Sequence, residues 1–162
     1  MNNNLQLDFG FGGPASGSSE VFLLLSIQHE YYVQIKNGSK KYEYRRIFRN
    51  DPTTTFLYVA SPYQTVSALA TFGQPFVGSV EAISKLAEEQ RKGGGESITR
   101  YMAGLTRGYA VPIESFEEIE PVTLKELRDR FPEFTPPQSY IVLNNYPNLL
   151  SFLLSRPRLI RP

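Results

Sequence analysis

Residues 21–49, VFLLLSIQHEYYVQIKNGSKKYEYRRIFR, carry the strongest structural signals in the chain. Residues 21–27 are an apolar run of strand length, which is typical of a strand buried on both faces. Residues 28–37 have apolar side chains four apart, the spacing of one side of a short helix, and the Asn-Gly pair at its end is a common left-handed helix ending. The alternation that follows predicts a second strand over 41–48.

The segment between this helix and strand is rich in charge and reads GSKKYEYR, residues 38–45. A turn at the glycine delivers Lys40 to the start of the strand, and Glu43 and Arg45, two residues apart, share one of its faces. A carboxylate between two cations can anchor an anionic or hydrogen-bonding ligand, position a water molecule, or form a salt-bridged surface. The residues alone leave these alternatives open.

The composition is that of one globular domain. The chain has 162 residues, of which 41% are hydrophobic and 20% charged. Its 10 tyrosines and 11 phenylalanines suit barrel walls and stacking surfaces alike. A net charge of +1 excludes a global basic field, but six of the seven charged residues in 36–49 are cations. A local basic patch is therefore expected there.

The absence of cysteine and the presence of one histidine exclude several classes of function. With no cysteine and one histidine, the chain has neither disulfides nor a conventional zinc site, so no metal and no cofactor are expected. No apolar run is long enough to span a bilayer, and no secretory signal is visible. We therefore expect an intracellular protein, cytoplasmic by default with the nucleus left open, and no membrane partner.

The rest of the chain predicts a mixture of short strands and short helices. Strands are expected at 54–60, 66–70, 76–83, 109–116 and 139–143, and helices at 83–91, 97–105, 123–130 and 148–154. The triple glycine at 93–95 is expected to end a helix and to act as a flexible linker.

This pattern indicates the α+β class, with a small β-barrel of about five to six mixed strands and short flanking helices. Residues 1–19, rich in Asn, Gly and Ser, are expected to be a flexible tail. The domain itself is expected to span residues 20–155, followed by a C-terminal tail at 156–162.

The pattern Gly-x-Lys-x-x-Glu-x-Arg, filled by Gly38, Lys40, Glu43 and Arg45, resembles the signature of ASCH domains, which are PUA-like proteins associated with RNA. Further stretches that resemble this family are residues 25–35, 56–62, 109–113 and 134–140, so the resemblance covers about residues 21–143. The chain departs from many members at 71–95, where it has a longer, partly helical insertion.

The resemblance implies a PUA-like barrel with a cleft beside the signature strand. Its expected ligand is RNA or a nucleotide-like molecule. In this first hypothesis, Lys40, Arg45 and Arg46 meet phosphates. Tyr31 is the tyrosine expected nearest the cleft, where it can stack on a base.

A second hypothesis is a hydrolase of the same fold, either a metal-independent ribonuclease or an amidohydrolase acting on a modified nucleoside. Here Lys40 serves as a base or oxyanion partner and Glu43 orients it or activates water. Tyr31 and Ser61 are further candidate donors. The amidohydrolase relatives have a Thr three residues after the Lys, where this chain has Glu43, so that chemistry does not transfer in full.

A third hypothesis is a non-catalytic interaction module in transcription regulation, which would use the acidic segment 114–133 and the tails. A protein partner is open in this case, and the sequence does not define an oligomeric state.

Overall fold

The computed structural model describes residues 19–160, so the expected N-terminal tail lies outside the described residues except for Ser19. The strands are β1 (Phe22–Ile27), β2 (Tyr42–Arg45), β3 (Thr53–Val59), β4 (Thr65–Phe72), β5 (Phe76–Ser79), β6 (Arg107–Thr123) and β7 (Tyr140–Val142). The helices are α1 (His29–Lys36), α2 (Val80–Gln90), α3 (Gly94–Tyr101), α4 (Leu124–Arg130) and α5 (Pro147–Leu154), with a 3-10 turn, η1 (Leu143–Asn145).

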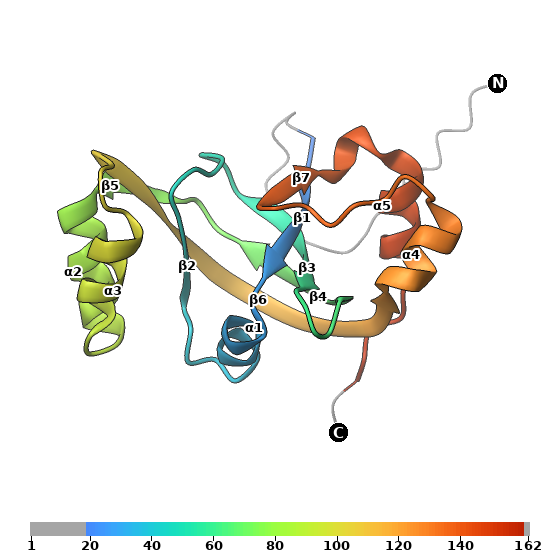
Figure 1. Ribbon diagram of the computed structural model, residues 1–162, viewed down its shortest axis with the longest axis horizontal. Helices are drawn as coiled ribbons and strands as arrows, with labels where there is room; N and C mark the ends of the chain where they lie inside the picture. Colours follow the sequence, from blue (N-terminus) through green and yellow to red (C-terminus); the bar gives the residue numbers. More distant parts are fainter. Residues whose placement is uncertain (1–18, 161–162) are drawn as a thin grey trace.

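The strands form one mixed, strongly curled sheet with the order β2-β6-β4-β3-β1-β7, and β5 pairs with β6 beside this path (Figure 1). The pair β1–β3 is parallel and the others are antiparallel. Short helices flank the sheet, so the predicted α+β class is confirmed. Among the described residues no helix has the length and apolarity needed to cross a membrane.

Strand β1 lies in the middle of the apolar core, as its sequence predicts. Leu23, Leu24 and Leu25 are each 0% exposed, and β1 pairs with both β3 and β7. Leu24 packs into one hydrophobic cluster, whereas Leu23 and Leu25 pack into another on the opposite face of the sheet. Burial on both faces explains why the strand reads as a continuous apolar run.

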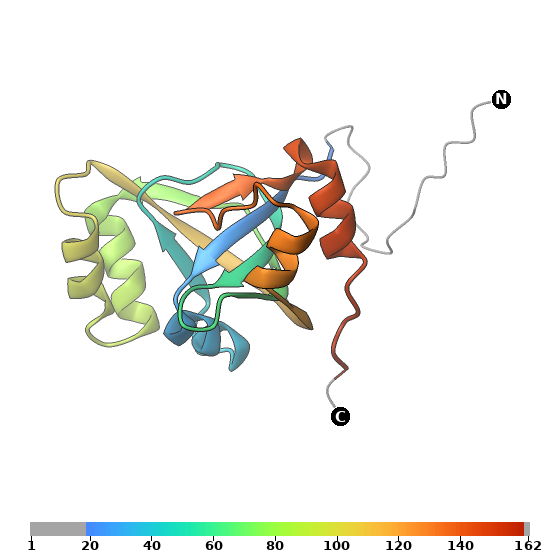
Figure 2. The ribbon, with the colours of Figure 1, turned by 45° about the vertical axis from the view of Figure 1, so that its right-hand side comes forward.

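Strand β6 is much longer than the predicted strand at 109–116, since it has 17 residues. Its C-terminal part pairs with β4, and its N-terminal part pairs with β5 on one side and with β2 on the other. It therefore runs through the whole molecule, from the α2–α3 pair at one end to α4 at the other (Figures 1 and 2). Among the described residues β6 is the one strand that pairs with β2, so β2 is an edge strand.

The α2–α3 pair corrects two expectations. The strand expected at 76–83 ends at Ser79, whose Oγ accepts a hydrogen bond from Ala82 N at 3.1 Å and so starts α2 earlier than predicted. The triple glycine is not a flexible linker, because Gly94 and Gly95 are buried and begin α3. A Cβ at Gly94 would lie 2.6 Å from Ala87 O, so only glycine permits this close approach of the two helices.

The loop between these helices is also fixed by a carboxylate that accepts backbone hydrogen bonds. The Glu88 carboxylate accepts hydrogen bonds from Gly93 N and Gly95 N, each at 3.0 Å. These contacts hold the pKa of the Glu88 carboxyl below its usual value, since they stabilise the ionised form. The carboxylate thus satisfies backbone donors at the start of α3 that a helix leaves unpaired.

In the C-terminal part of the domain the start of α4 is as the sequence predicts, whereas the residues after α5 are more closely attached than expected. Thr123 Oγ1 accepts a hydrogen bond from Glu126 N at 3.1 Å, which is the predicted cap of α4. The residues expected as a C-terminal tail lie along β6, where Glu120 N donates to Pro157 O and Leu159 N donates to Glu118 O, both at 2.9 Å. Residues 161–162 are outside the described range.

Candidate functional site

The turn between α1 and β2 places Lys40 beside the sheet edge. Helix α1 ends before Gly38, which has φ +79° and reverses the chain. Lys40 N then donates a hydrogen bond to Gln34 O at 3.0 Å, which fixes the start of β2 against α1. The Asn-Gly ending predicted from the sequence is thus the feature that positions the first charged residue of the signature.

Glu43 lies between two cations, as the alternation predicts. It is only 6% exposed, with Oε2 3.5 Å from Lys40 Nζ and Oε1 2.9 Å from Arg45 Nε. The second distance is that of an ion pair, but Arg45 Nε is not aligned for a hydrogen bond. Glu43 Oε2 likewise receives no hydrogen bond from any described residue. The single negative charge is therefore more than compensated, and the carboxylate retains capacity as a hydrogen-bond acceptor.

Arg45 also links two strands that do not pair with each other. Its Nη2 donates a hydrogen bond to Ser26 O, near the end of β1, at 3.1 Å. Because β2 pairs only with β6 among the described strands, this side chain connects its free edge back to the central strand of the core. The cluster is thus part of the fold as well as a candidate site.

Aromatic rings surround the Lys40 ammonium. Lys40 Nζ lies 5.1 Å from the ring centroids of both Tyr31 and Tyr44, within the range of a cation–π contact. Burial, with smaller effects of Tyr42 and Glu43, raises the pKa of Tyr44 to about 12. The pKa of Tyr31 is raised chiefly by burial as well. Both hydroxyls therefore stay protonated and can donate hydrogen bonds at neutral pH.

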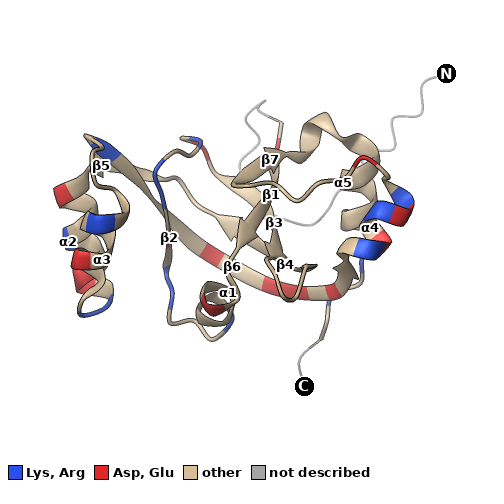
Figure 3. Ribbon diagram, viewed as in Figure 1, with Lys and Arg blue, Asp and Glu red and all other residues tan. Residues whose placement is uncertain are grey.

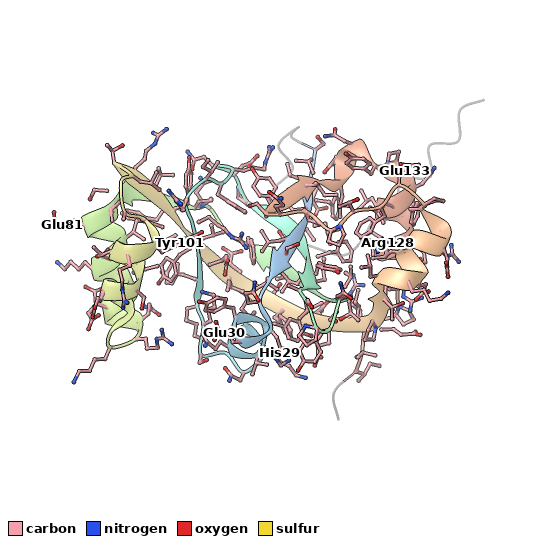
Figure 4. The ribbon with its side chains drawn as sticks, in the orientation of Figure 1. His29, Glu30, Glu81, Tyr101, Arg128 and Glu133 are labelled. Atoms are coloured by element: carbon pink, nitrogen blue, oxygen red, sulfur yellow. The ribbon has the colours of Figure 1, made fainter. Side chains whose placement is uncertain are left out.

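These residues line a cleft of about 460 Å³ that runs along β2 between α1 and the α2–α3 pair. The helix pair contributes Arg91 and Tyr101 to the lining, and Tyr101 projects from α3 toward β2 (Figure 4). The charged lining residues are Lys40, Lys41, Arg45 and Arg91 against Glu43. Cations in and just before β2 and one at the end of α2 therefore converge on one cleft. Acidic residues occur along β6 and in several helices (Figure 3).

The structure brings four of the six predicted site residues together and leaves two apart. Tyr31, Lys40, Glu43 and Arg45 all line the cleft. Arg46 does not, because β2 ends at Arg45 and the next side chain is exposed to solvent. Ser61 does not line it either, since it is exposed in the turn after β3, beside the cis Ser61–Pro62 bond.

Sequence reasoning missed Arg91 and Tyr101. Both lie far along the chain from the signature, and they reach the cleft only because α2 and α3 pack against the β2 side of β6. The sequence holds no local signal for this, apart from the insertion at 71–95. Among residues 19–160, no three side chains of the metal-binding types gather in a way that could hold an ion.

The curled sheet, the short helices and a cleft at an edge strand define a small α+β domain. Three crystal structures of an ASCH protein from Zymomonas mobilis are similar to it. The first matches with a TM-score of 0.72 at 19% identity, over 86% of this chain and 98% of the other. The others are single-residue variants, serine to alanine and tyrosine to phenylalanine, with TM-scores of 0.69 and 0.68 at 21% identity. They cover 81% and 80% of this chain, and 95% and 96% of their own.

The chain therefore has the ASCH fold. No protein-family model matches the sequence, and no curated protein matches it either.

Proposed function

We propose that the chain binds single-stranded RNA, or a nucleotide of the same chemistry, in the cleft along β2. The observation that supports this most directly is the composition of the lining, which combines four cations and several tyrosine rings with one carboxylate. Lysine and arginine side chains hold phosphates in place, and aromatic faces stack on unpaired bases. Such a combination suits a ligand that is both planar and anionic.

The size of the cleft agrees with a small part of an RNA strand. Its volume of about 460 Å³ falls within the roughly 300–1,000 Å³ of small-molecule sites. Because the net charge of the whole chain is only +1, the attraction for phosphate is concentrated at the cleft. We therefore expect recognition of one or a few nucleotides rather than of a long duplex.

Two accessible rings come from different walls of the cleft. Tyr31 on α1 is 40% exposed and Tyr101 on α3 is 45% exposed, whereas Tyr42 and Tyr44 are partly buried against the α2–α3 side. Exposed rings are the ones that a base can reach, and each such stacking contact contributes about 1–3 kcal/mol. Tyr31 and Tyr101 are thus the proposed stacking residues.

The contacts of Lys40 favour binding over the hydrolase hypothesis. Its ammonium meets the faces of two rings and the Glu43 carboxylate, and all three attract a cation. That environment suits a lysine that acts as a fixed cationic donor toward a ligand.

The test is the affinity for a fluorescent five-nucleotide single-stranded RNA, measured by anisotropy at several salt concentrations. Arg91→Ala should weaken binding and reduce the salt dependence by about the contribution of one phosphate contact. Arg100→Ala is the matched control, because it removes the same charge from the same helix pair at an exposed position outside the cleft. Absence of binding at low salt, or equal effects of the two substitutions, would refute the proposal.

A further inference from the structure

The three charged side chains of the signature have complementary hydrogen-bonding chemistry. An ammonium and a guanidinium are donors only, and an ionised carboxylate is an acceptor only. The two oxygens of Glu43 face different cations, with Oε2 toward Lys40 and Oε1 toward Arg45. The carboxylate therefore lies between its partners, and the cluster presents a donor, an acceptor and a donor in that order.

This row retains unused capacity. Glu43 Oε2 and Arg45 Nε are themselves buried, and neither has a hydrogen-bond partner among the described residues. A buried polar atom without a hydrogen bond is costly, so a ligand toward which these side chains shift slightly, and which supplies the missing partners, gains affinity and specificity. All three side chains line the cleft, with 8–13% of each exposed.

The ligand group that fits must donate one hydrogen bond between two acceptors. A cationic donor on the ligand is disfavoured, since Glu43 already faces two cations and the lining carries an excess of positive charge. The donor is therefore a neutral N–H, and the tyrosine rings nearby favour its being part of a flat ring.

Among the nucleobases, uracil carries this pattern along its pairing edge, as a carbonyl oxygen, a ring N–H and a second carbonyl oxygen. Cytosine and adenine instead place a bare ring nitrogen at the central position, whose lone pair would face the carboxylate. Guanine has the ring N–H but sets an amino donor against one of the cations. Single-stranded RNA exposes these edges to side chains.

We propose that the Lys40–Glu43–Arg45 row reads the imide edge of a uracil-type base, with Glu43 accepting the ring N–H. This inference rests on the proposed binding of RNA in the same cleft. It adds a preference among bases, which phosphate contacts and stacking do not supply.

The experiment compares three five-nucleotide RNAs of equal charge with the unmodified protein, made of uridine, of cytidine and of 3-methyluridine. In 3-methyluridine a methyl group replaces the hydrogen on the ring nitrogen, and both carbonyl groups remain. We expect the uridine RNA to bind at least about tenfold more tightly than either of the others. Equal affinities, or tighter binding of the cytidine RNA, would overturn the base preference while leaving the binding function standing. If none of the three RNAs binds at low salt, the binding function itself fails.

The substitution Glu43→Gln assigns the preference to this residue. It keeps the shape of the side chain, removes its negative charge and replaces one acceptor oxygen with a donor amide, so the advantage of uridine over 3-methyluridine should fall. Thermal melting of the variant checks that it is folded. If it is not folded, the comparison of the three RNAs with the unmodified protein still tests the base preference. A folded variant that keeps the full preference would remove Glu43 from the recognition.

Discussion

The two ends of β6 support different kinds of structure. At the α4–α5 end the strand joins a large apolar cluster that includes Leu24, Ile119 and Leu153, each 0% exposed. At the α2–α3 end the cluster is small, and partly buried tyrosines of β2 pack against it. Charged side chains and close glycine contacts replace apolar burial there. The comparison indicates that apolar burial is concentrated at one end of the strand, whereas the proposed ligand site lies at the other.

The largest expected effect comes from the apolar end. Leu24→Ala should lower the free energy of unfolding by about 2–5 kcal/mol, because Leu24 is fully buried and its removal leaves a cavity. Urea denaturation followed by circular dichroism measures this change. If the two ends are separate in function, the folded fraction should bind RNA as the unmodified protein does, and a large loss of affinity would contradict the comparison.

A smaller loss of stability, combined with a loss of binding, is expected at β2, the edge strand beside the cleft. Arg45→Met removes the contact with Ser26 O and leaves Glu43 with Lys40 as its remaining cation. Unfolding should become easier by about 1–3 kcal/mol, and RNA affinity should fall. Adding Glu43→Gln to this variant should recover part of the stability, since the buried charge is then gone. Additive losses in a double-mutant cycle would show that the two side chains act independently.

The smallest effect is expected in the α2–α3 loop and depends on pH. Glu88→Gln should lower the melting temperature at pH 7, because the ionised Glu88 accepts hydrogen bonds from two glycine N–H groups. The pKa of Glu88 is lower in the folded protein than its ordinary value of 4.5. Its contribution is therefore present above about pH 4.5 and is lost as the pH falls through the folded value.

Thermal melts of Glu88→Gln and of the unmodified protein should accordingly converge as the pH is lowered from 4.5 through the folded pKa of Glu88. Glu96→Gln is the matched control on the same helix pair. Its side chain is 78% exposed and forms only a long ion pair with Arg100, so the substitution should change stability by less than about 0.5 kcal/mol. A similar pH-dependent loss in both variants would show that the backbone contacts of Glu88 do not matter.

Local sequence patterns predict the central strand and the signature cluster well. Burial on both faces of β1 requires an apolar run, and the turn at Gly38 with the two-residue period of β2 brings Lys40, Glu43 and Arg45 together. These features depend on neighbours in the chain, so a single sequence displays them.

The helix pair could not be predicted in the same way. Glycine favours neither helix nor strand by itself, and Gly94 and Gly95 begin α3 because that helix packs closely against α2. Arg91 and Tyr101 reach the cleft through the same packing. Arg46 is missing from the lining because β2 stops one residue before it. In each case contacts with distant parts of the chain decide the outcome.

One pairing within the sheet has a consequence for protein engineering. Ser79 and Arg107, the residues at either side of the α2–α3 segment, are paired neighbours in β5 and β6. A short hairpin turn could therefore join them directly, in place of residues 80–106. The α2–α3 wall of the cleft could thus be exchanged as one segment while the rest of the sheet is kept, which would allow the proposed ligand preference to be redesigned.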